Sequence, residues 1–167
     1  ATTINNWGTN AALALEDNEK GLVSSDEYLG VFYPWGFTSD NFGNNVVVPP
    51  SHMMLRTFLY NDQVSYQWFA PAGTRRGLVD NVSAIGYVDA GSGEFVRTGI
   101  RNSLRDVLYE NRLNPITLIN GVGLVAYGQK TRARAASALD RINVARLVCY
   151  LRRQLNALAK PDRKSVV

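Results

Sequence analysis

The chain of 167 residues is poor in side chains that bind metals or form cross-links, since it holds one cysteine, Cys149, and one histidine, His52. A single cysteine excludes a disulfide bond within the chain and fits a reducing compartment. Zinc sites need several clustered Cys or His ligands, and calcium loops need closely spaced acids, so we expect no metal site. We expect Cys149 to be a small buried side chain in a helix.

Long apolar runs are also missing. No stretch approaches the roughly 18 consecutive apolar residues that a membrane-spanning helix requires, and 46% of the residues are hydrophobic, which is ordinary for a globular protein. We therefore expect a chain that folds around a core of its own and does not insert into a membrane.

The motifs of common enzymes are absent too. No Gly-x-Ser-x-Gly elbow or Gly-Lys-Ser/Thr phosphate loop occurs, and Gly121-Val122-Gly123 lacks the further glycine of a dinucleotide fingerprint. Ser51 and His52 are adjacent on an expected helix, where neighbouring residues do not face one another. We predict no catalytic, cofactor-binding or metal-binding residue and no enzyme activity. A hydrolase with an irregular site that depends on His52 stays open as an alternative.

Charge is distributed unevenly along the chain. Residues 130–164 contain ten basic and two acidic residues, a net charge of +8, whereas the rest of the chain has a net charge of −4. A basic segment on a mildly acidic body indicates a partner with negative surface potential. Charge alone does not distinguish a nucleic acid, an anionic membrane and an acidic protein.

Apolar residues, glycines and prolines divide the first half of the chain into short elements. Residues 28–33, rich in aromatic and branched side chains, predict a strand that Pro34 ends. Residues 36–45 are polar and predict a loop. Residues 46–48 predict a strand that leads into a helix opened by Pro50, because proline is tolerated in a first helical turn.

The second half contains clearer patterns. Residues 68–76 predict a loop, and residues 79–96 a loop with short strands. Apolar residues at helical spacing predict a helix over 100–113, closed by Asn114-Pro115. Residues 116–119 and 122–127 predict two strands around Asn120-Gly121, either as a type I′ hairpin or as a helix–strand connection.

The last predicted helix is the most regular element. It starts after Asp140, which is well placed as an N-cap, and an aliphatic stripe runs along it that we expect to face the core. Its members are Val144, Leu147, Val148, Leu151, Leu155 and Leu158. The basic residues lie mostly off this stripe.

Several motifs occur in an order that resembles the contractile tail sheath proteins of bacteriophages and related injection machines. From about Leu29 to Lys160 they are Tyr33-Pro34-Trp35, Val48-Pro49-Pro50-Ser51, Ala70-Pro71-Ala72-Gly73 with Arg75-Arg76-Gly77, Leu108-Tyr109, Asn114-Pro115-Ile116, Gly121-Val122-Gly123, Tyr127-Gly128 with Lys130-Thr131, and Asp140-Arg141-Ile142-Asn143-Val144. Each motif is short and unspecific alone, and their fixed order makes the resemblance specific.

This resemblance implies an α/β (α+β) fold, with a small mixed sheet packed by helices. Residues 1–98 would be part of a middle sheath domain with a protease-like fold, and residues 99–161 the C-terminal, tube-facing sheath domain. We expect residues 162–167 to be a non-native tail, since a translated adapter oligonucleotide encodes the same six residues. Terminal arms that add strands to neighbouring subunits are not visible in this sequence.

The implied function is structural. Sheath subunits stack as hexameric rings around an inner tube and contract to drive the tube through a cell envelope. Implied partners are neighbouring sheath subunits, an acidic inner tube protein, and baseplate and tail terminator proteins. The implied location is the virion tail, assembled in the cytoplasm of the bacterial host.

The same resemblance implies two sets of contact residues. Those expected to contact the tube are Arg141, Arg146, Arg152, Arg153 and Lys160. Those expected to form an inter-subunit sheet edge are Ile116, Thr117, Leu118, Val122, Leu124 and Val125. A basic nucleic-acid-binding domain is the main alternative, although aromatic side chains interleaved with the basic ones, as single-strand binders have, are nearly missing. A solvated basic face on a core helix is the plainest reading of these arginines.

Overall fold

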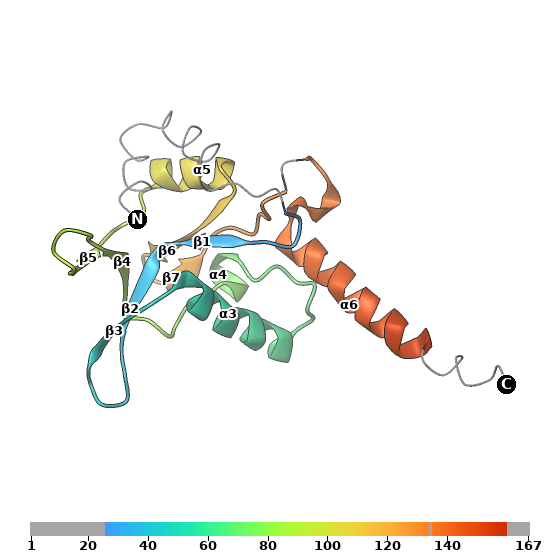
Figure 1. Cartoon of the computed structure of the whole chain (residues 1–167), viewed down its shortest axis with the longest axis horizontal. Coiled ribbons are helices and arrows are strands. Elements are labelled where there is room, and N and C mark those ends of the chain that lie inside the picture. The colour runs from blue at the N-terminus through green and yellow to red at the C-terminus, as the bar shows by residue number, and fades with distance from the viewer. Residues whose placement is uncertain (1–25, 134, 160–167) are drawn as a thin grey trace.

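The computed structural model describes residues 26–133 and 135–159, and a three-stranded mixed sheet lies at its centre (Figure 1). Strand β6 (Leu113–Ile119) is the middle strand. It pairs in parallel with β1 (Val31–Tyr33) and antiparallel with β7 (Gly123–Ala126). A strand from the first half of the chain therefore completes a sheet made by the second half.

A four-stranded antiparallel sheet lies beside the first, in the order β3-β2-β4-β5. Its strands are β2 (Trp35–Ser39), β3 (Asn45–Val48), β4 (Ala84–Val88) and β5 (Phe95–Arg97). The loop predicted over residues 36–45 is therefore wrong, because only 40–44 form the turn of a β2–β3 hairpin. Gly43, at φ +83°, takes the left-handed conformation that this turn requires.

Within residues 26–133 and 135–159, four α-helices and one 3-10 turn accompany the sheets. They are α3 (Pro50–Val64), the single turn α4 (Gly73–Arg76), α5 (Asn102–Glu110), the 3-10 turn η1 (Ala138–Asp140) and α6 (Ile142–Ala159). The helix opened by Pro50 is confirmed. The helix predicted to end at Asn114-Pro115 ends earlier, because Arg112 turns the chain at φ 60° and Leu113 already belongs to β6.

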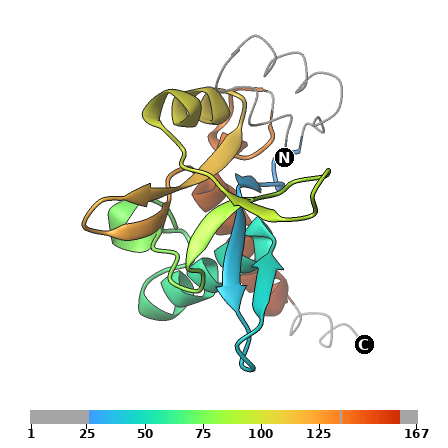
Figure 2. The same cartoon turned by 90° about the vertical axis from the view of Figure 1, so that its left-hand side faces the viewer.

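The hydrophobic core is split between the two faces of the three-stranded sheet, with α5 on one side and α3 on the other (Figures 1 and 2). One cluster joins α5 to the sheet through Leu104, Leu108 and Leu113. The other joins α3 to both sheets through Met53, Met54, Ile116 and further residues. Side chains alternate along a strand, so β6 supplies Leu113 to the first cluster and Ile116 to the second. The α+β architecture is confirmed.

The hairpin predicted around Asn120-Gly121 is present as β6 and β7, but its turn is not of type I′. Ile119 pairs with Gly123, so the loop has three residues, 120–122. A type I′ turn needs positive φ at both central residues, whereas here Gly121 has φ +79° and Asn120 does not. The backbone N–H of Val122 donates to the carbonyl of Ile119 over 3.1 Å. This arrangement matches a type II turn, with glycine at its third residue.

Candidate interaction surface

Helix α6 is held at its base by residues of the sequence motifs, and Asn114 lies at their centre. This side chain is fully buried. Its Nδ2 donates to the carbonyls of Val31, at 3.0 Å, and Lys130, at 2.8 Å, while its Oδ1 accepts from the N–H of Lys130 at 2.7 Å. A Cβ at Gly128 would lie 2.8 Å from that Oδ1. Asn114 thus ties β1 and β6 to the segment that leads into α6.

Thr131 continues this network into the helix. Its hydroxyl donates to the carbonyl of Leu139 at 2.8 Å, and its N–H donates to the carbonyl of Asp140 at 2.8 Å. The N–H of Ile142, in the first turn of α6, donates to the carbonyl of Gln129 at 2.8 Å. Asp140 belongs to η1 and α6 begins at Ile142, so the predicted N-cap at Asp140 is wrong. The start of α6 is anchored by backbone bonds.

One side of α6 packs on the body of the protein. Ile142 and Ala145 are buried. Nη2 of Arg146 binds both carboxylate oxygens of Asp62 on α3, at 2.6 and 2.5 Å, and its guanidinium lies 5.0 Å from the ring centroid of Phe58. Tyr150 packs on Trp68 with ring centroids 5.3 Å apart. These contacts fix the direction in which the helix leaves the body.

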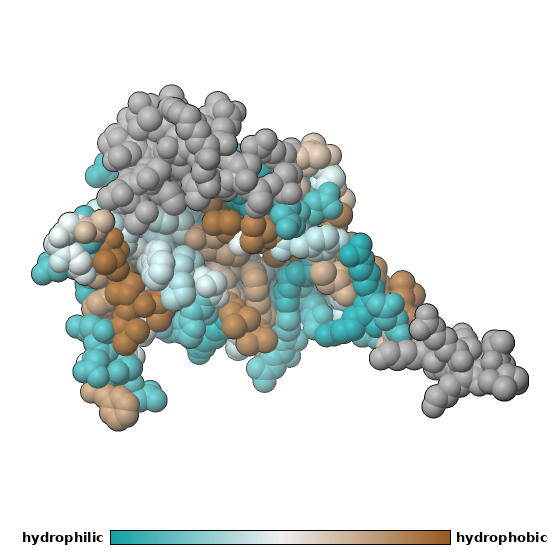
Figure 3. Space-filling view, in the orientation of Figure 1, coloured by the Kyte–Doolittle hydropathy of each residue, from teal (hydrophilic) through white to brown (hydrophobic). Residues whose placement is uncertain are grey.

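The other half of α6 projects away from the body (Figure 1). Every residue from Leu151 to Ala159 is exposed, and the exposed fractions of Leu151, Leu155 and Leu158 are 48%, 64% and 71%. Figure 3 shows brown, hydrophobic surface along this helix among hydrophilic side chains. The prediction that the aliphatic stripe faces the core is therefore wrong for these three leucines.

The geometry of the helix explains this reversal. Successive helical residues are about 100° apart around the axis, so Leu151, Leu155 and Leu158 lie roughly opposite Ile142 and Arg146. The body of the protein takes the side that carries Arg146 and leaves the leucines outward. Cys149 is exposed as well, so its predicted burial is wrong. A stripe of exposed apolar side chains along a surface helix indicates an interaction site.

The predicted basic contact residues fall into three groups. Arg141, Arg152 and Arg153 are exposed. Arg146 is committed to Asp62, and its side chain is only 21% exposed, so it fastens α6 to α3 and is not free for a partner. Lys160 lies outside the described residues. Between Ile142 and Ala159 the helix contains three arginines and no acid, so its projecting half is cationic and apolar at once.

Three phage proteins resemble the chain in sequence. Over 156 residues it is 32% identical to the tail sheath protein of Enterobacteria phage T4, covering 93% of this chain and 22% of that protein. Over 101 residues it is 41% identical to the tail sheath protein of Vibrio phage KVP40, covering 60% of this chain and 13% of that protein. The tail sheath protein of Salmonella phage ViI is 27% identical over 84% of this chain and 21% of its own length. The resemblance to the contractile tail sheath family is confirmed.

Solved structures show the same fold. The sheath complex of the PVC extracellular contractile injection system in its contracted state matches 98% of this chain and 39% of its own with a TM-score of 0.69 and 21% identity. The contracted helical sheath of the anti-feeding prophage matches 95% of this chain and 43% of its own with a TM-score of 0.67 and 19% identity. No family profile matches the chain. The chain thus spans less than half of each sheath protein it resembles.

Most of the β6–β7 hairpin is covered by other parts of the same chain. Ile116, Thr117, Leu124 and Val125 are buried, whereas Leu118 and Val122 are 64% and 42% exposed. On the outer side of β7, the N–H of Val79 donates to Leu124 at 2.8 Å, and the N–H of Ala126 donates to Gly77 at 2.7 Å. Most of the predicted inter-subunit edge is therefore core or already paired, which leaves Leu118 and Val122 near the tip. Contact of this hairpin with a neighbour stays a prediction.

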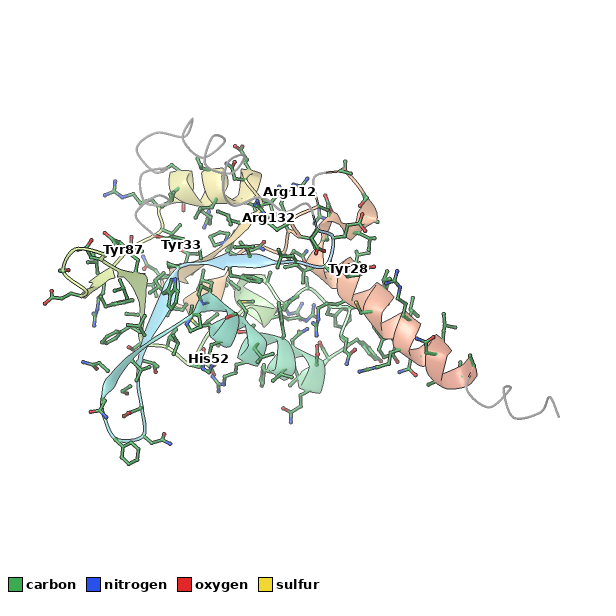
Figure 4. All side chains as sticks on the ribbon, viewed as in Figure 1. Tyr28, Tyr33, His52, Tyr87, Arg112 and Arg132 are labelled. Atoms are coloured by element: carbon green, nitrogen blue, oxygen red, sulfur yellow. The ribbon has the colours of Figure 1, made fainter. Side chains whose placement is uncertain are left out.

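The described residues that could serve in catalysis or metal binding do not gather at one site. His52 is exposed on α3 (Figure 4). Among residues 26–133 and 135–159, no three His, Cys, Asp or Glu side chains gather as a metal site would need. No helix in those ranges is long and apolar enough to cross a membrane. Burial, with Tyr87 nearby, raises the pKa of Tyr33 to about 12. This tyrosine packs in the core between β1 and α5.

Proposed function

We propose that this chain is part of a contractile sheath subunit. The subunit polymerises as stacked hexameric rings around an inner tube and contracts to drive the tube through a cell envelope. The observation that carries the proposal is the agreement of two independent comparisons, sequence relatives named tail sheath protein and sheath chains with the same fold over nearly all of these residues. Its role is structural, without catalysis.

In this proposal the projecting half of α6 faces the inner tube. The leucine stripe supplies apolar area, and the exposed Arg141, Arg152 and Arg153 add positive charge that suits an acidic tube surface. Of the three, Arg152 lies beside the leucines, Arg153 lies on the opposite side of the helix, and Arg141 precedes its first turn. Exposed charge pairs are individually weak and are screened by salt. Contacts of this kind suit an interface that must release when the sheath contracts. Neighbouring sheath subunits, the baseplate and the tail terminator complete the set of proposed partners, in a virion tail assembled in the host cytoplasm.

We also propose the division expected from the sequence, with a middle domain before residue 99 and a tube-facing domain after it. Support comes from the four-stranded sheet, which lies wholly before residue 99, and from α5, β6, β7 and α6, which lie wholly after it. The parallel pairing of β1 with β6 joins the two parts.

Negative-stain electron microscopy of the purified full-length subunit, of which this chain is part, tests the function. Striated hollow tubes of uniform width are expected, alone or around an added inner tube. Monodisperse single particles at every salt and protein concentration would contradict the proposal. A salt-dependent gel shift with DNA, lost on replacing Arg152 and Arg153 by alanine, would instead favour the nucleic-acid alternative.

A further inference from the structure

The tip of the β2–β3 hairpin displays a phenylalanine in solvent. Phe42 is 91% exposed, the largest exposed fraction among the large hydrophobic side chains of residues 26–133 and 135–159. The far end of this hairpin extends beyond the rest of the two sheets, at the lower left of Figure 1. Figure 3 shows an apolar patch at its far end, beyond hydrophilic strands. Burial of this ring by a partner would remove a large apolar area from water.

The tip is organised by Asp40, so the ring is presented on a fixed loop. One carboxylate oxygen of Asp40 accepts from the N–H groups of Phe42 and Asn44, both at 2.8 Å, and the other accepts from Nδ2 of Asn44 at 3.0 Å. The N–H of Gly43 donates to the carbonyl of Asp40 at 3.1 Å. An anchor that is already ordered loses little conformational entropy on binding.

A pocket that suits such a ring lies elsewhere on the same chain, at the root of α6. It has a volume of about 240 Å³, and its wall is mostly apolar. Its lining residues are Tyr28, Gly30, Phe32, Phe58, Thr131, Ile142, Ala145, Arg146 and Cys149. Nη1 of Arg146 is buried there without a hydrogen-bond partner in the described part of the chain.

The hairpin and the pocket cannot meet within one molecule. Figure 1 places the hairpin at one end of the body and the root of α6 at the other, and Figure 4 shows Tyr28, which lines the pocket, at the α6 end. When the tip of the hairpin in one copy enters the pocket of the next, the two copies form a head-to-tail contact. Repetition of such a contact makes rings or helical filaments.

We infer that Phe42 of one copy inserts into the pocket at the root of α6 in a second copy of this chain. This inference rests on the proposed sheath function, to which it adds a named subunit contact. Charge favours the pairing as well. Residues 31–50 contain Asp40 and no basic residue, whereas Arg152 lies 5.6 Å from the ring centroid of Tyr28, which lines the pocket. In this contact the acidic tip approaches the guanidinium of Arg152.

Cross-linking tests the contact, because the native Cys149 lines the pocket. A minority of Phe42→Cys subunits is assembled with wild-type protein, which keeps most contacts intact, and a short bismaleimide is added. We expect a covalent dimer whose cross-linked peptide joins residues 42 and 149. Ser92→Cys, at an exposed position in the β4–β5 turn, is the matched control and gives no 92–149 peptide. Cys149→Ser in the wild-type partner abolishes the 42–149 product.

A second pair of variants measures how much the ring contributes. Phe42→Ala is expected to weaken self-association by roughly tenfold or more, as the loss of an aromatic anchor does, while Phe42→Tyr keeps the ring and most of the affinity. Light scattering follows both, and circular dichroism shows that they fold. If tubes form without a 42–149 cross-link and Phe42→Ala assembles like wild type, this contact is wrong and the proposed function stands. If wild-type protein never associates, the proposed function fails and the contact with it.

Discussion

At the scale of single residues, the ion pair between Arg146 and Asp62 is the strongest polar link between α6 and the body. Both side chains are only 21% exposed, and one guanidinium nitrogen reaches both carboxylate oxygens. Hydrogen bonds to charged groups contribute about 1.5–3 kcal/mol when they are sheltered. Sequence patterns had grouped Arg146 with the surface arginines, since spacing on one helix does not reveal an acid on another.

We therefore predict that Arg146→Ala lowers the free energy of unfolding by about 2 kcal/mol, because it leaves Asp62 partly buried without its cation. Arg153→Ala, on the exposed part of the same helix, serves as the control and changes the free energy by less than about 0.5 kcal/mol. Urea unfolding of the variants and of Asp62→Asn, combined as a double-mutant cycle, isolates the pair. A coupling near zero would show that the pair does not fasten α6.

Tyr33 is expected to make the free energy of unfolding fall as the pH rises above 10. Burial raises its pKa from 10.0 to about 12, so the folded state favours the neutral phenol more than the unfolded state does. This contribution is fully present below pH 10 and is lost as pH rises through the folded pKa near 12. A shift of this size corresponds to on the order of 2–3 kcal/mol.

The expected result is a fall in the free energy of unfolding between pH 10 and pH 12 that is smaller in Tyr33→Phe than in wild type. Denaturant titrations at several pH values measure it, with the exposed Tyr60→Phe as the control. Equal pH dependence in Tyr33→Phe and wild type would mean that other groups cause the alkaline loss.

At the scale of elements, the first half of α6 is fixed by contacts with the body and the second half is exposed to solvent. Its first half is held by Asn114, Thr131 and the Arg146–Asp62 pair, whereas its second half contacts little of the body. An exposed leucine contributes little to folding in the isolated chain, so changes on this half separate assembly from stability.

We predict that Leu155→Glu leaves the free energy of unfolding within about 0.5 kcal/mol of wild type and prevents assembly with the inner tube, because the charge falls in the middle of the leucine stripe. Asn156→Glu is the matched control, since it adds the same charge one residue away and on the opposite side of the helix from the leucines. Co-sedimentation with tubes reports assembly. Normal sedimentation of Leu155→Glu would show that the stripe is not the tube-facing surface.

At the scale of the whole molecule, the two halves of the chain share a sheet and a core. Strand β1 pairs with β6, and the cluster under α3 combines Met53 and Ile85, which precede residue 99, with Ile116 and Leu124, which follow it. The proposed boundary near residue 98 therefore separates groups of helices and strands and does not separate independently folding units. Residues on each side bury apolar side chains of the other.

Accordingly, we predict a single cooperative unfolding transition, with calorimetric and van't Hoff enthalpies that agree. Differential scanning calorimetry, together with fluorescence and circular dichroism melts that coincide, measures this. Two separate transitions, one of them unaffected by Ile116→Ala, would mean that residues on either side of position 98 fold as independent domains.

The sequence by itself determined the family resemblance, the α+β class, the helix that starts at Pro50 and the two strands on either side of Asn120-Gly121. These depend on local signals, namely ordered motifs, a proline at a helix start, and glycine where a turn needs positive φ. Local signals survive because neighbouring residues interact in any fold of the chain.

Only the tertiary structure decided which way α6 faces, which arginine is an internal link, and which part of the predicted edge is core. A period of 3.6 residues shows that an apolar stripe exists, and it does not show what covers the stripe. Asp62 and Arg146 are far apart in sequence and meet because the fold brings the last turn of α3 to the first half of α6. The tip of one hairpin and the pocket at the root of α6 become a matching pair only when the fold places them at opposite ends of one body.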